Sequence, residues 1–160
     1  MGEKAIKNII RILFVIYCVI LFYILFLYSA RTGNQFNLAT FSKEHIEMVN
    51  ITPLKTLLDF KDRINNSTIN IGIVVQNILA NLLMFIPMGM ALPVLFKDKF
   101  NKLWKIVVFI VCLVLGVEII QFLTFCGSAD IDDLVLNTIG CMIGYGIVQI
   151  KCVRKLFKLD

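Results

Sequence analysis

The sequence predicts an all-α integral membrane protein, a bundle of four transmembrane helices with cytoplasmic N- and C-termini and a long first extracellular loop. Of the 160 residues, 59% are hydrophobic and 17% charged, a composition too apolar for the surface of a soluble domain. The charges are grouped and leave four apolar stretches, most of them long enough to cross ~30 Å of hydrocarbon. The predicted spans of this single 1–160 membrane domain are about 12–30, 71–96, 106–126 and 132–150, with 31–70 as the outer loop.

Positive charge predicts the orientation of these spans in the lipid bilayer. It lies in three groups, which are Lys4, Lys7 and Arg11, then Lys97, Lys99, Lys102 and Lys105, then Lys151, Arg154, Lys155 and Lys158. Cytoplasmic segments carry such an excess because Lys and Arg resist translocation. Both termini and the second loop then lie inside, which requires an even number of spans. We therefore read the net charge of +5 as a topology signal and expect no nucleic acid partner.

The first span carries no charged residue and is expected only to anchor and pack. In the outer loop, Pro53 excludes the interior of a helix, while Ile46 to Val49 and Leu57 to Phe60 are expected to form short interfacial elements.

The second span contains two prolines, Pro87 and Pro93, which predict a bend or break. Internal proline is tolerated in membrane helices when neighbouring groups satisfy the freed carbonyls. We expect a kink between Met84 and Gly89. The alternative is that the helix ends at Ala91 and the loop begins there.

Polar residues in the last three spans form the candidate site. They are Asn77, Asn81, Glu118, Gln121, Asp130, Asp133 and Asn137. Spacings of three or four residues place the members from each span on one helix face, and all of them map to the outer half. Burying a carboxylate such as Glu118 without a partner costs at least a few kcal/mol. The polar stripes are therefore expected to face one another or a wet cavity.

Simpler roles for these residues stay open. The amides could act only as hydrogen-bonding links between helices. Asp130 could be only a helix cap, and Asp132, on a different face from its neighbour, is expected to be a loop or cap residue. On the polar face of the last span, Gly140 and Gly144 would let a neighbouring backbone come close.

Other chemistry has little support in the sequence. The five cysteines are scattered without a CxxC spacing, and His45 stands alone in a polar loop. We expect neither a metal site nor a cofactor.

Several blocks of residues carry a resemblance to a known family. They are Asn50-Ile51-Thr52-Pro53, Asn77 through Asn81 to Phe85-Ile86-Pro87-Met88-Gly89, Glu118-Ile119-Ile120-Gln121, and Asp130-Ile131-Asp132-Asp133 with Asn137, Gly140 and Gly144. In their order and spacing, over roughly 50–146, the chain resembles the VanZ family of small bacterial membrane proteins. Many members carry an arginine shortly before the first aspartate, where this chain has Cys126-Gly127-Ser128-Ala129. That difference weakens any catalytic role that needs a cation beside the carboxylates.

The resemblance implies a multi-pass protein of the cell membrane that contributes to glycopeptide resistance, against teicoplanin in particular. It implies action at the outer face, without catalysis, on a lipid-linked cell-wall precursor or a lipoglycopeptide in the outer leaflet. An alternative is a membrane enzyme or flippase that uses Glu118 and Asp133 on lipid-linked envelope precursors. A flippase this small would need a homodimer, for which Gly140 and Gly144 are candidates. A structural partner in a larger complex is a further alternative.

Overall fold

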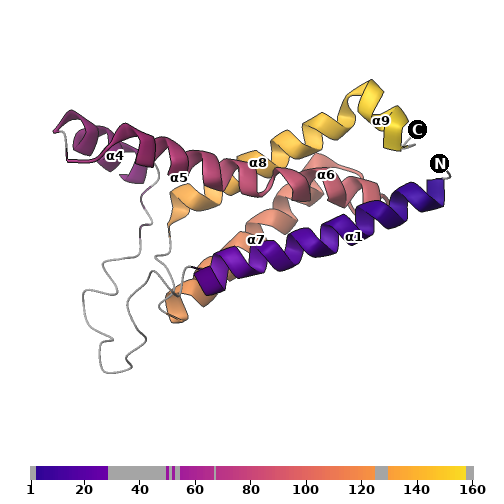
Figure 1. Ribbon diagram of the computed structural model, residues 1–160, viewed down its shortest axis with the longest axis horizontal. Coiled ribbons are helices and arrows are strands. Elements are labelled where there is room, and N and C mark those ends of the chain that lie inside the picture. Colours follow the sequence, from indigo (N-terminus) through magenta and orange to yellow (C-terminus); the bar gives the residue numbers. More distant parts are fainter. Residues whose placement is uncertain are drawn as a thin grey trace.

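The computed structural model describes residues 3–28, 50, 52, 55–66, 68–124 and 130–157, and its regular elements there are helices (Figure 1). Within these ranges, helices long and apolar enough to cross a membrane cover Ala5–Leu27, Ile71–Leu95, Leu103–Leu123 and Ile131–Gln149. Spans of 19 to 25 residues are about 28–38 Å long at the α-helical rise, which suits a bilayer. The predicted all-α bundle of four spans is confirmed. The orientation of its ends stays a prediction.

The first span consists of α1 (Glu3–Phe22), which continues as the π-helix η1 (Tyr23–Tyr28). In the predicted outer loop, α4 (Lys55–Asn65) includes the interfacial element expected at 57–60 and is longer than expected. The other expected interfacial element, at 46–49, lies outside the described residues.

The second span is broken where its prolines predicted. Phe85 separates α5 (Ile71–Met84) from α6 (Ile86–Leu95), and Pro87 follows in the first turn of α6, where a missing N–H costs least. The expected kink is therefore confirmed. The alternative, an end of the helix at Ala91, is wrong because α6 continues for another turn.

A side chain from the first span supports this break. The Tyr17 hydroxyl donates a hydrogen bond of 2.8 Å to the carbonyl oxygen of Met84, the last residue of α5. Phe85 itself is only 1% exposed and belongs to the main hydrophobic core. The break thus combines a buried aromatic anchor with a satisfied carbonyl, as interrupted membrane helices require.

The remaining helices are α7 (Leu103–Leu123), α8 (Ile131–Gln149) and the short α9 (Lys151–Phe157). α8 occupies the centre of the bundle, where it contacts α5, α6 and α7, while α1 packs against α6. Figure 1 shows the N- and C-terminal ends of the chain on the same side. This agrees with an even number of crossings.

The inward face of α7 changes from apolar to polar along the helix. Ile106, Ile110 and Val114, spaced four residues apart, are at most 1% exposed and form part of the core. Glu118 and Gln121 continue the same face and are also buried, at 8% and 9% exposure. Because α7 starts beside the lysine-rich second loop, its buried polar groups lie at the opposite end of the bundle.

Glycines allow α8 to pack directly against the backbone of the second span. A Cβ atom at Gly140 would lie 2.0 Å from the carbonyl oxygen of Leu82, and one at Gly144 would lie 2.1 Å from that of Ile86. Gly89 of α6 packs against the backbone of α8 in the same way. This face of α8 is occupied within the chain, so a homodimer would need another surface than the one suggested by these glycines.

We expect Gly144→Ala to destabilise the protein by about 1–3 kcal/mol, because the added methyl group overpacks a contact made by backbone. The measurement is the thermal melting of the purified protein in detergent, followed by circular dichroism. Gly146→Ala is the control, since it lies in the same helix with nothing within 4 Å of its Cβ position. Equal melting temperatures for the two variants would contradict the packing role.

Candidate functional site at the polar end of the bundle

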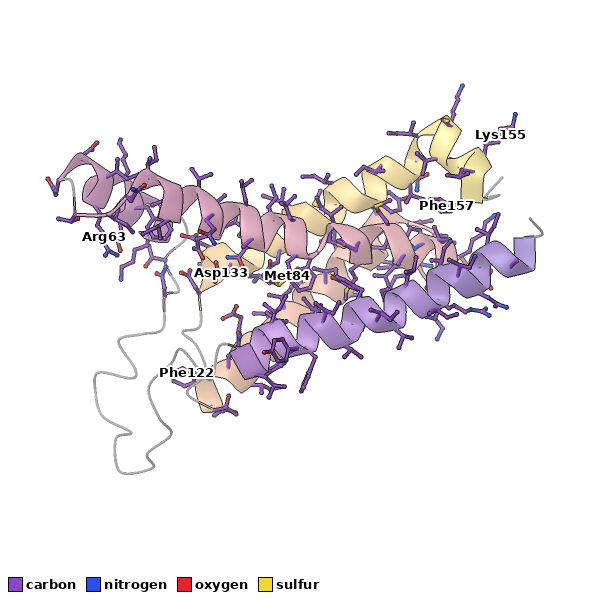
Figure 2. All side chains as sticks on the ribbon, in the orientation of Figure 1. Arg63, Met84, Phe122, Asp133, Lys155 and Phe157 are labelled. Atoms are coloured by element: carbon purple, nitrogen blue, oxygen red, sulfur yellow. The ribbon has the colours of Figure 1, made fainter. Side chains whose placement is uncertain are left out.

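Polar groups from three spans meet at one end of the bundle. The Asn81 side-chain amide of α5 donates a short hydrogen bond to the Asp133 carboxylate of α8. The backbone N–H of Asp130, which precedes α8, donates to the Glu118 carboxylate of α7 over 3.2 Å. Figure 2 shows Asp133 near the start of α8, close to α5. The second, third and fourth spans are thus joined by contacts to carboxylates.

A residue of the predicted outer loop completes this cluster. The Asn50 amide donates to the Asp130 carboxylate over 3.0 Å, and the Asn50 carbonyl accepts from the backbone N–H of Ile131 over 3.1 Å. The two strands of chain form an isolated parallel bridge at this point. Our sequence-based site did not include Asn50, although it begins the first block of the family resemblance.

Asp130 and Asp132 have different roles at the start of α8. Asp130 caps the helix, since its side chain accepts from the backbone N–H of Asp132 over 2.9 Å. It also accepts from Asn50, so it is more than a cap. The expectation that Asp132 is a loop or cap residue is wrong: it lies in the first turn of α8 and its side chain is only 3% exposed.

The cluster is rich in hydrogen-bond acceptors. Glu118 accepts from the backbone of Asp130 at the start of α8, and Asp133 follows in the first turn of the same helix. An ionised carboxylate can only accept hydrogen bonds. Such a site suits a ligand that presents hydroxyl, amide or ammonium donors. Among the described residues, no group of three or more His, Cys, Asp or Glu side chains is arranged to hold a metal ion.

Asn137 adds a buried acceptor one helical turn beyond Asp133. Its side chain is 5% exposed, and its Oδ1 atom has no hydrogen-bond partner among the described residues. The hydroxyl oxygen of the next residue, Thr138, is also buried without a hydrogen-bond partner among the described residues. A buried polar atom left without a partner costs about 1–3 kcal/mol. Asn137 is therefore a side chain that a bound donor group would stabilise.

Two of the predicted site residues lie apart from the cluster. Gln121 is buried, but its amide donates to the carbonyl oxygen of Leu25 in η1 over 2.8 Å, so it links α7 to the first span. This contact fits the simpler role of an interhelical link. Asn77 lies one turn before Asn81, yet its side chain is exposed. Within the described part of the chain, no contact brings Asn77 to the carboxylates.

The fold and this cluster define a small polytopic membrane protein with an acceptor-rich site at one end of its helix bundle. The family described as VanZ/LLP1 matches residues 14–152, and the chain belongs to this family. It is 32% identical over 129 residues to Protein VanZ of Enterococcus faecium, a match that covers 79% of this chain and 68% of the relative. No solved structure matches the chain. The family that the sequence motifs indicated is confirmed.

We expect Asn81→Ala to destabilise the protein by about 1–3 kcal/mol, because it removes a donor from the half-buried Asp133 carboxylate. Asn77→Ala should change stability little, since that side chain is exposed. Thermal melting of both variants in the same detergent measures the difference. A loss at Asn77 as large as the loss at Asn81 would show that the contact with Asp133 is not what matters.

Proposed function

We propose that the chain is a multi-pass protein of the cell membrane that contributes to teicoplanin resistance by binding a ligand at the outer face, without catalysis. Membership of the VanZ/LLP1 family supports the link to glycopeptide resistance. The positions of the lysines and arginines support the orientation, because α8 runs from the polar cluster to the basic residues that follow it.

The observation that carries the proposal is that polar side chains of three spans, acceptors on α7 and α8 and a donor on α5, lie at one end of the bundle, each buried or half-buried. Glu118, Asp133 and Asn137 come from α7 and α8, and α5 contributes Asn81, which holds Asp133. Polar and ionisable groups at membrane depth are costly to bury, so their presence there indicates a functional role. The ligand is a lipid-linked cell-wall precursor or a lipoglycopeptide of the outer leaflet. Sugars and peptides of either compound supply the hydroxyl and amide donors that the acceptors need.

Expression in a susceptible Gram-positive host tests this function. We expect the wild-type chain to raise the minimum inhibitory concentration of teicoplanin more than that of vancomycin, because the proposed function acts on lipid-linked compounds in the outer leaflet. Glu118→Gln, Asp133→Asn and Asn137→Ala should each lose most of this increase. Asn77→Ala should keep it, since that side chain is exposed outside the cluster.

Immunoblots of isolated membranes show whether each variant accumulates to the wild-type level. Full resistance in a Glu118, Asp133 and Asn137 triple alanine variant that still accumulates would overturn the binding site. An equal increase for teicoplanin and vancomycin would overturn the dependence on lipid.

A membrane enzyme or flippase for lipid-linked envelope precursors is the second candidate. The observation that favours it is that two carboxylates, Glu118 and Asp133, lie on neighbouring helices at the same end of the bundle. Such a pair can move protons to and from a substrate. Altered lipid-linked species in membranes with the wild-type chain, absent with Glu118→Gln, would support this candidate over binding alone.

A further inference from the structure

Two hydrogen-bond acceptors at the polar end of the bundle lie one turn apart on α8. Asp133 and Asn137 are separated by four residues, so their Cβ atoms are about 5–6 Å apart on one face of the helix. In an α-helix each Cα–Cβ bond tilts toward the N-terminus of the helix. The Asn137 side chain therefore leans toward the turn that carries Asp133, at the end of α8 where the acceptor-rich cluster lies.

The face of α8 that carries this pair packs against α5 on both sides of Asn137. On one side Asp133 accepts the hydrogen bond from Asn81, and on the other Gly140 admits the carbonyl group of Leu82. Asn137 lies between these two contacts, in agreement with its exposure of only 5%. Asp133, nearer the end of the bundle, is half-buried, so a ligand group can reach the pair from that side.

The chemistry of this pair favours one kind of donor. An ionised carboxylate has two oxygens with about four acceptor positions, and Asn81 uses one of those on Asp133. The Oδ1 atom of Asn137 is buried without a hydrogen-bond partner among the described residues. A hydroxyl or amide group would bring an acceptor of its own into this buried position, where it would need a further donor. A primary ammonium group has three N–H donors, no acceptor and a charge opposite to that of a carboxylate.

We propose that Asp133 and Asn137 together bind a primary ammonium group of the ligand. One N–H donates to the Asp133 carboxylate and another to the Oδ1 atom of Asn137, and the positive charge compensates a carboxylate that is costly to bury unpaired. This inference rests on the proposed function and narrows its ligand to a lipid-linked compound with a free amine, as in a peptide or an amino sugar. Asn137 then selects for the amine, because a buried acceptor gains most from a donor-only group.

A methylation series of one phospholipid tests which group is recognised. Phosphatidylethanolamine, its N-methyl and N,N-dimethyl forms and phosphatidylcholine all keep a positively charged nitrogen, while the number of N–H donors falls from three to none. Native mass spectrometry of the purified full chain in detergent measures how much of each lipid is bound. We expect phosphatidylethanolamine to bind at least about tenfold more tightly than phosphatidylcholine, the effect of charge-assisted hydrogen bonds. Equal binding of these two lipids by the wild-type chain would overturn the proposal.

Two variants locate the preference within the chain. Asp133→Asn removes the charge with little change of shape, and Asn137→Leu replaces the amide by an apolar group with the same branching. Each should reduce the preference for phosphatidylethanolamine over phosphatidylcholine to about twofold or less, because each removes one of the two contacts that hold the ammonium group. A preference that survives unchanged in either variant would overturn binding by the pair.

Thermal melting separates binding from a structural role of Asn137. Because its Oδ1 atom has no partner among the described residues, Asn137→Leu without added lipid should melt at or above the wild-type temperature. A lower melting temperature would assign Asn137 to helix packing and overturn its role in binding. Thr138→Val is the matched control, since it removes another buried oxygen without a described partner, about 100° around the helix. It should keep the lipid preference, and an equal loss there would contradict the site.

The lipid-binding experiment and the resistance assay can fail separately. If the wild-type chain shows no preference for phosphatidylethanolamine while Asp133→Asn still loses teicoplanin resistance, the ammonium inference fails and the proposed function stands. If the preference is present and Asn137→Leu loses it but keeps full resistance, the ammonium site stands and the proposed function fails.

Discussion

The structure depends on the close approach of α8 to the broken second span. Gly140 and Gly144 let the carbonyl groups of Leu82 and Ile86 lie where side chains would otherwise be. Such a contact allows little sliding, because neighbouring side chains on either helix would then meet backbone. It therefore fixes which residues of the two helices face each other. The hydrogen bond between the side chains of α5 and α8 at the polar end follows from this register.

The two ends of the bundle differ in the polarity of their buried side chains. On α7 the inward face is apolar from Ile106 to Val114 and then polar at Glu118. The polar partners that a buried carboxylate needs must therefore come from the end of the bundle where Glu118 lies. Little of the first span is buried. Within the described residues, apolar packing joins it to the other spans, together with hydrogen bonds from Tyr17 to the Met84 carbonyl and from Gln121 to the Leu25 carbonyl. One of these supports the break in the second span, and the other uses Gln121. Polar groups thus serve both the site and the packing of a weakly buried helix.

Sequence patterns located the break and most of the clustered side chains, but they did not separate Asn77 from Asn81. Four residues apart on a helix, these two share a face, and periodicity treats them alike. Only Asn81 lies opposite a carboxylate, because α8 begins at that level. Asn50 could not be assigned either, since its partner Asp130 is far away in the sequence. The prediction for Asp132 was wrong because residue spacing does not indicate which side of α8 other elements cover.

Composition and the distribution of charge determined by themselves that the chain is a membrane bundle of four spans. A largely apolar segment that is long enough to cross the bilayer has few stable conformations in lipid other than a helix, so a local property of the sequence decides this level. The membership of the site was decided by tertiary structure. Contacts such as Asn50 with Asp130, or Asn81 with Asp133, join residues distant in the sequence. Their proximity depends on the register and rotation of packed helices, which side-chain volumes and glycine contacts set.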